Sequence, residues 1–92
     1  MMTDDDLLAR ITTNPTIMGG KPTVRGLRIT VEQIVRWFAA GTGEQELLRQ
    51  FPFLEPEDVR AALLYASRVT ALARMSGEAV AKATHLEDAP AR

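Results

Sequence analysis

Hydrophobic residues recur at helical spacing near the middle of the chain and predict a helix over residues 31–40. The apolar positions of this segment that share one face are Val31, Ile34, Val35 and Phe38. Thr30 and Gln33 have the spacing of a capping box at its start, and Gly41 provides a left-handed stop. The capping box, the apolar spacing and the terminal glycine therefore all predict the same amphipathic helix.

The same pattern predicts a short second helix and a long third helix. Thr42 is the expected N-cap of the second helix, which ends before Pro52 because a residue that precedes proline disfavours helical angles. Pro56 suits the first position of the third helix, and no residue interrupts this helix before Ser76. Its predicted apolar stripe comprises Val59, Ala62, Leu63, Ala66, Val69 and Ala73. Since twenty helical residues span roughly 30 Å, the second half is expected to stay exposed or to contact a partner.

Short β-branched segments precede the helices and suit strands better than helices. They lie at residues 11–13 and 16–18. We expect residues 17–18 to pair with residues 27–30 around a glycine-rich loop, as a short N-terminal β-hairpin. The predicted fold is mainly α, with a tri-helical helix-turn-helix core and a long third helix.

The length of 92 residues predicts one small domain. We place its helical domain, including the β segment and a frayed helical turn at residues 4–10, within residues 1–76. Residues 77–92 are alanine-rich with mixed charge and predict a flexible tail. Because much of the apolar content is alanine, which buries little area, stability is expected to depend on a partner or on formation of a homodimer.

Charge is nearly balanced, but its distribution is uneven. The chain has 11 Lys and Arg against 12 Asp and Glu, so the net charge of -1 gives no overall attraction to nucleic acid. Residues 19–36 nevertheless carry four cations against the single carboxylate of Glu32. Together with one arginine of the third helix, they are the candidate nucleic-acid-binding residues: Lys21, Arg25, Arg28, Arg36 and Arg60. The alternative is that these side chains are solvated or brace nearby carboxylates.

The loop that carries these cations is rich in residues with special backbone angles. Its structural residues are Gly19, Gly20, Pro22 and Gly26. It resembles a phosphate-binding loop only superficially, since Pro15 stands where that pattern needs glycine and Pro22 where it needs a hydroxyl. An anion-binding turn or a simple hairpin loop fits better.

The sequence offers little material for catalysis. There is no cysteine, which excludes disulfides and thiolate chemistry, and the single histidine, His85, lies in the predicted tail. Glu55, Glu57 and Asp58 are explained by the positive end of the third helix. We therefore expect a non-enzymatic protein with no metal and no cofactor. Its acidic start lacks the features of a signal peptide and no apolar run reaches membrane-spanning length, so a cytoplasmic location is expected.

The long third helix also presents bulky residues largely outside its main stripe. The candidate partner or dimer contacts are Leu64, Tyr65, Arg68, Leu72 and Met75. Their position on the part of the helix that outruns the domain favours contact with another protein.

One combination of motifs resembles a known family. The residues that carry the resemblance are Asn14-Pro15, Gly19-Gly20-Lys21-Pro22, Arg25-Gly26, Arg28-Ile29, Gly41, Phe51-Pro52 and Leu54 to Asp58. They are similar to the domain-of-unknown-function family DUF433, which includes VapB-like antitoxins, over about residues 11–67. The resemblance implies a homeodomain-like fold, dimers that bind their own operator DNA and, for some members, a PIN-like ribonuclease toxin as partner.

These observations favour a non-enzymatic DNA-binding antitoxin of a type II toxin–antitoxin pair, which neutralises a PIN-like toxin and autoregulates its operator. The alternative is a homodimeric protein-interaction module that does not bind DNA. In that case the glycine-rich loop is purely structural and the long helix supplies the contact surface.

Overall fold

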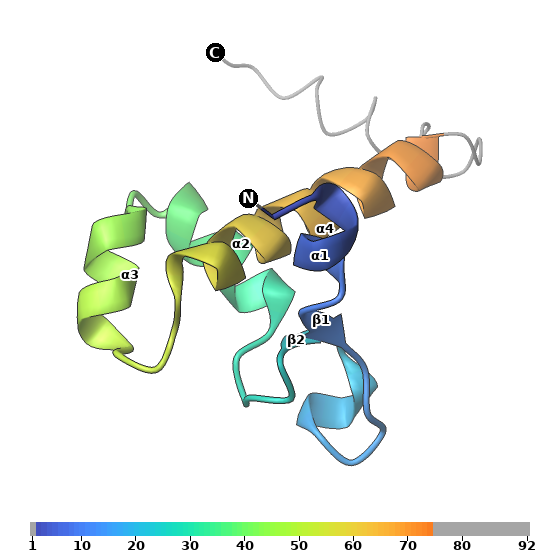
Figure 1. Cartoon of the computed structure of the whole chain (residues 1–92), viewed down its shortest axis with the longest axis horizontal. Coiled ribbons are helices and arrows are strands. Elements are labelled where there is room, and N and C mark those ends of the chain that lie inside the picture. Colours follow the sequence, from blue (N-terminus) through green and yellow to red (C-terminus); the bar gives the residue numbers. More distant parts are fainter. Residues whose placement is uncertain (1, 75–92) are drawn as a thin grey trace.

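The long helix α4 (Pro56–Arg74) is the element around which the others are arranged (Figure 1). The computed structural model describes residues 2–74, and within them α4 contacts every other α-helix and both strands. The other helices are α1 (Asp4–Leu8), α2 (Val31–Ala39) and α3 (Glu44–Gln50), and the strands are β1 (Ile11–Thr12) and β2 (Thr23–Val24). The fold is thus mainly helical with a small two-stranded antiparallel sheet.

Helix α2 begins with the predicted capping box. The Thr30 hydroxyl accepts a hydrogen bond from the Gln33 backbone N–H at 3.0 Å, and the Gln33 side chain accepts one from the Thr30 backbone N–H at 2.9 Å. Both interactions satisfy backbone donors that a helix start leaves open. The prediction of this helix is confirmed to within one residue at its end.

The predicted N-cap of the next helix is wrong. Gly43, not Thr42, is the N-cap of α3, and it makes no side-chain capping hydrogen bond. Thr42 belongs to the end of α2 instead, because its backbone N–H donates to the Trp37 carbonyl at 2.9 Å. The N–H of Gly41 donates to Phe38, with a φ of 99° at the glycine, so the two residues form a Schellman-type helix end.

The predicted strand pairing is also wrong. Residues 16–18 form no strand, since the Asn14 side chain accepts hydrogen bonds from Thr16 and folds the chain into a turn that leads to the 3-10 helix η1 (Met18–Gly20). The strand at residues 11–12 is confirmed, but its partner is β2, with Ile11 opposite Val24. Residues 27–30 fold back on β2 rather than on residues 17–18, and Thr30 bridges Thr23. We call residues 23–30 the hairpin.

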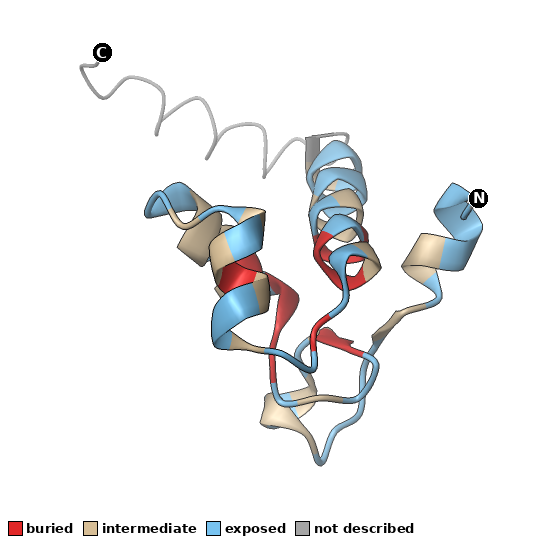
Figure 2. Ribbon diagram, turned by 60° about the vertical axis from the view of Figure 1, so that its left-hand side comes forward, coloured by how far each residue is buried: buried red, intermediate tan, exposed pale blue. Residues whose placement is uncertain are grey.

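The core lies between α2, α3 and the first half of α4 (Figure 2). Its buried residues are Val24, Ile29, Val31, Ile34, Leu47, Leu54, Val59 and Ala62. Trp37 extends it by stacking on Phe51, with ring centroids 5.0 Å apart. This packing fixes the hairpin and the first turn of α4 against the same core.

The predicted stripe of α4 is buried only in its first half. Val59 and Ala62 are buried, whereas Leu63 is exposed and does not belong to the core face. Farther along, Val69 is 45% exposed, so the second half of the helix outruns the core as expected.

Several predicted features lie outside the described residues. They are Met75, Ser76 and the proposed tail of residues 77–92, including His85. No helix in the part of the chain that the structure describes is long and apolar enough to cross a membrane.

Candidate functional site

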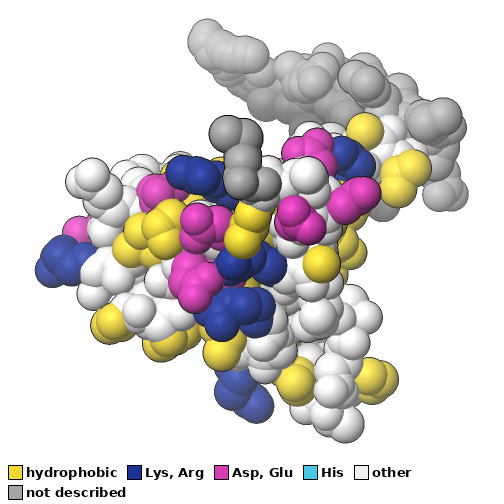
Figure 3. Space-filling model, in the orientation of Figure 1, with side chains coloured by type: hydrophobic (Ala, Val, Ile, Leu, Met, Phe, Trp, Pro, Cys, Tyr) yellow, Lys and Arg dark blue, Asp and Glu magenta, His cyan; other side chains and the backbone are white. Residues whose placement is uncertain are grey.

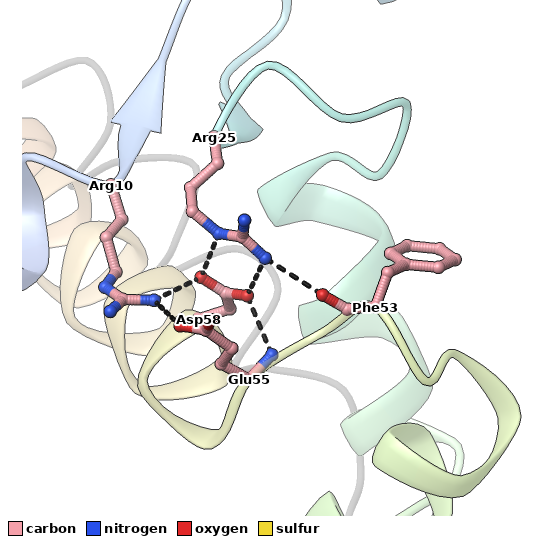
Figure 4. Close-up of polar contacts among 5 residues, drawn as sticks. All are labelled: Arg10, Arg25, Phe53, Glu55 and Asp58. Carbon is pink, nitrogen blue, oxygen red and sulfur yellow. Dashed lines mark hydrogen bonds and ion pairs between the residues drawn. The ribbon is translucent and has the colours of Figure 1, made fainter.

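The carboxylate of Asp58, in the first turn of α4, is fully buried and accepts four hydrogen bonds (Figure 4). Its Oδ1 accepts hydrogen bonds from Arg10 at 2.8 Å and from Arg25 Nε at 2.9 Å. Its Oδ2 accepts one from Arg25 NH2 at 2.7 Å and one from the Glu55 backbone N–H at 2.8 Å. Arg10 also pairs with the Glu55 side chain at 2.7 Å. We call these four residues, Arg10, Arg25, Glu55 and Asp58, the Asp58 cluster.

The backbone of the hairpin turn aims Arg25 at this carboxylate. Arg25 and Gly26 have φ angles of 49° and 72°, and the Leu27 N–H donates to the Val24 carbonyl at 2.8 Å. Two successive residues with positive φ are typical of the tight turns that suit a twisted hairpin. Such a φ is costly for arginine. The Arg25 backbone N–H is held by the Arg10 carbonyl at 2.7 Å, which anchors the strained residue.

The cluster keeps Asp58 ionised although its side chain is fully buried. Burial acts to raise the pKa of Asp58, but hydrogen bonds from Arg25, from the Glu55 backbone and from Arg10 outweigh it and hold the pKa below its usual value. Hydrogen bonding to Glu55 and then to Asp58 raises the pKa of Arg10, and the bond to Asp58 raises that of Arg25. The four side chains therefore form a charge-neutral group of two cations and two carboxylates.

Arg25 thus braces a carboxylate, which is the alternative to nucleic-acid binding that the sequence left open for the loop cations. Its guanidinium also donates to the Phe53 carbonyl at 2.9 Å, so it ties the hairpin to the segment between α3 and α4. Arg10 was not among the residues singled out from the sequence. No local pattern marks it, because its partner Asp58 is 48 residues away.

The other candidate cations do not join this cluster. Lys21 and Arg36 flank Glu32, at 3.3 and 3.9 Å, on the surface beside the start of α2. Arg28 and Arg60 are exposed and form no ion pair with the residues that the structure describes. Figure 3 shows Lys and Arg interspersed with Asp and Glu on the face it presents, not a single basic surface.

A groove of about 400 Å³ lies between the start of α2 and the second half of α4. Its apolar wall consists of Pro22, Val31, Val35, Tyr65, Ala66 and Val69. Lys21, Glu32 and Arg36 also line it. We call this feature the α2–α4 groove.

The candidate partner residues of α4 lie in different surroundings and do not form one surface. Tyr65 lines the α2–α4 groove, Leu64 is half-buried and Leu72 is exposed. Arg68 instead pairs with Asp4 of α1 at 3.0 Å. Sequence reasoning assigned Val69 to the core stripe, and its role as a groove residue follows only from the packing of α2 against α4.

The described residues offer no ready metal site. Within residues 2–74 no group of three or more histidine, cysteine, aspartate and glutamate side chains is placed to hold an ion. Every buried side-chain polar atom in that range has a hydrogen-bond partner. The Asp58 cluster is consequently a satisfied structural network rather than a set of groups open to a substrate.

A family model described as "Protein of unknown function (DUF433)" matches residues 11–66. The chain belongs to the DUF433 family. The matched region spans the sheet, the glycine-rich loop, α2, α3 and the first half of α4, and it includes Arg25 and Asp58 of the cluster. Arg10 and the groove residue Val69 lie just outside it.

A search of curated proteins finds a relative, "Uncharacterized protein y4eO" of Sinorhizobium fredii (strain NBRC 101917 / NGR234). It is 40% identical over 65 residues, which make up 67% of this chain and 29% of the relative. The chain thus spans less than a third of the length of this relative. No solved structure matches the chain.

Proposed function

We propose that this DUF433 protein is a non-enzymatic, DNA-binding antitoxin of a type II toxin–antitoxin pair, which acts as a homodimer, neutralises a PIN-like ribonuclease and autoregulates its operator. The family resemblance supports the choice of toxin. The observation that carries the DNA-binding part of the proposal is the neutralisation of the acidic start of α4.

In a tri-helical helix-turn-helix protein, the last helix enters the major groove with its N-terminal residues near the bases. In the proposed arrangement, α3 and α4 are the crossing pair. Glu55, Glu57 and Asp58 at the start of α4 would on their own repel phosphates. Arg10 and Arg25 remove most of this obstacle, because they pair with Asp58 and Glu55 at 2.7–2.9 Å. Only Glu57 is then left without a cationic partner among the described residues.

Other cations are available for phosphate contacts. Arg28 and Arg60 are exposed and without an ion pair among the described residues. Lys21 and Arg36 share the exposed carboxylate of Glu32, and exposed pairs of this kind are worth little and exchange readily. Since the net charge is -1, any attraction to DNA has to come from such local cations.

A gel-shift titration of the full chain with its own upstream DNA, at two salt concentrations, tests the proposal. We expect salt-sensitive binding that weakens by about tenfold for the double substitution of Arg28→Ala and Arg60→Ala, because each lost phosphate contact reduces affinity on all sequences. Arg68→Ala is the matched control, since Arg68 pairs with Asp4 and should leave DNA binding unchanged. The absence of any shift, with or without the toxin, would refute DNA binding.

The exposed second half of α4 favours one alternative, a homodimeric protein-interaction module without DNA affinity. Leu72 is 68% exposed and Val69 45%, so two bulky apolar side chains from adjacent turns of the helix face solvent and could contact a second chain. Light scattering combined with the gel shift separates the two functions. A dimer that never shifts DNA would support the alternative.

A further inference from the structure

The apolar face of α4 continues beyond the part of the domain that covers it. Val69 lies seven residues after Ala62, which is two helical turns, so both side chains point to the same side of the helix. Ala62 is fully buried, whereas Val69 is 45% exposed. The difference arises because α2 packs over the first half of α4 and leaves the α2–α4 groove beside the second half.

The walls of this groove are suited to aliphatic side chains. Pro22, Val31 and Val35 line one side and Tyr65, Ala66 and Val69 the other. The groove volume of about 400 Å³ exceeds what one side chain fills, and the groove is open to solvent. An amphipathic helix that enters such a groove buries apolar residues spaced three and four positions apart.

The charges beside the groove are unequal. Lys21 and Arg36 both face the single carboxylate of Glu32, at 3.3 and 3.9 Å, which leaves one positive charge uncompensated. Glu32 is the only acidic group among the described residues that line the groove. Both cationic side chains are well exposed, at 60% and 77%, so they can turn toward a ligand without breaking a buried contact.

We propose that the α2–α4 groove docks an acidic amphipathic helix from a partner protein. Bulky aliphatic side chains of that helix pack on Val35, Tyr65 and Val69, and a carboxylate beside them pairs with Lys21 and Arg36. The proposal deepens the proposed function and rests on it for the identity of the partner, because the toxin would supply this helix. A second copy of the chain fits less well, since a two-fold contact through the groove would bring two positive rims together.

Selection of helical peptides from a random display library against the full-length protein tests the chemistry of the groove without the toxin or DNA. We expect the selected peptides to share aliphatic residues three or four positions apart and at least one Asp or Glu. For a labelled synthetic copy of the best peptide, fluorescence anisotropy should show binding to the wild-type protein that is about tenfold tighter than binding to Val69→Asp. Val69→Ser, a milder change at the same exposed position, should weaken binding less.

Repeating the selection with a charge-reversal variant gives a more specific test of the role of the two cations. Selection against the double variant Lys21→Glu and Arg36→Glu should yield peptides in which Lys or Arg replaces the acidic residue. Arg60→Glu is the matched control, because Arg60 is exposed on the same helix but does not line the groove. It should select the same acidic peptides as the wild-type protein. Circular dichroism of each variant verifies that the fold is retained.

Three results would overturn the inference. One is the failure to select any peptide. Another is a set of selected peptides that is not enriched in Asp and Glu, or whose charge does not change when the double variant replaces the wild-type protein. The third is a wild-type dimer that Val69→Asp dissociates, which would assign the groove to a second copy. Toxin neutralisation and the DNA gel shift are measured separately. A protein that binds acidic helices but neither DNA nor a toxin would refute the proposed function and leave the groove inference intact.

Discussion

At the scale of single residues, Asp58 is the residue that links Arg10 and Arg25 to the start of α4. Its carboxylate is buried and accepts four hydrogen bonds, three of them from the guanidinium groups of Arg10 and Arg25. A buried ion pair is weak evidence of net stabilisation, because desolvation offsets much of the attraction. Removing the carboxylate is different, since it leaves two partly buried guanidinium groups beside each other without their shared anion.

Asp58→Asn should therefore destabilise the protein strongly. The amide keeps the shape but not the charge, and its nitrogen faces arginine donors, so we expect a loss of about 3 kcal/mol in the free energy of unfolding. Urea denaturation followed by circular dichroism measures this. Glu46→Gln is the control, because Glu46 pairs with Arg49 on the surface of α3, where solvent screens the interaction, and its loss should be far smaller than that of Asp58→Asn. Equal losses in the two variants would contradict the assigned role of the cluster.

The ionisation of Asp58 also predicts how stability depends on pH. In the unfolded chain an aspartate has a pKa of about 3.9, whereas the cluster holds the folded pKa of Asp58 below its usual value. Between these two values the unfolded state binds a proton that the folded state does not. The stabilisation is thus fully present above about pH 4 and is lost as the pH falls through the folded pKa.

Denaturation of the wild-type protein and of Asp58→Asn at a series of acidic pH values tests this. The difference in unfolding free energy between the two should shrink as the pH falls below about 4. The comparison cancels the contribution of Glu46, whose pKa is also lowered, mainly by its hydrogen bond to Arg49. A difference that stays constant over this range would show that Asp58 has the same pKa in both states.

At the scale of elements, the sequence predicts what is encoded locally. The start of α2 follows from Thr30 and Gln33, which are three residues apart and contact each other in the structure. The start of α4 is also encoded locally, because proline is favoured at the first position of a helix and α4 begins at Pro56. The mistaken cap of α3 shows the limit of such patterns, since Thr42 has the right spacing but its backbone is already bound to Trp37.

Pairing between elements is harder to predict from the sequence, because it depends on contacts between residues that are far apart along the chain. Residues 11–13 and 16–18 have similar β propensity, and composition does not say which of them pairs with the hairpin. The turn at Asn14 removes residues 16–18 from strand geometry, and the Arg10–Arg25 backbone hydrogen bond, between residues 15 positions apart, secures the register of β1. Strand propensity alone could not have given this register.

The residues of the candidate site were likewise predicted only in part from the sequence. The cations of the glycine-rich loop were recognised from their density, but only the fold separates Arg25, which braces Asp58, from Arg28, which is exposed. An arginine directly before a glycine, a combination that suits a tight turn, and an aspartate at the third position of a helix are sequence features that could have suggested the pair. Their 33-residue separation gave no local signal.

At the scale of the whole molecule, the Asp58 cluster joins three segments that are far apart along the chain. Arg10 precedes β1, Arg25 follows β2 and Asp58 lies in α4, as Figure 4 shows. Helix α1 contributes no buried residue of its own, although it contacts α4 and pairs with it through Asp4 and Arg68. Since only Ile11 among the described residues of this segment packs against the core, we expect the cluster to help hold the N-terminal segment in place.

Native-state hydrogen exchange should reveal this dependence. In the wild-type protein we expect the slowest amides in α2 and the first half of α4, where the core is buried, and the fastest helical amides in α1. In Asp58→Asn, protection of the Arg25 amide, which donates to the Arg10 carbonyl, should fall by more than the general loss of stability explains. Protection in α2 should fall only by that general loss, since no residue of α2 belongs to the cluster. Uniform loss across all amides would mean that the domain opens only as a single unit and that the cluster does not anchor the N-terminal segment separately.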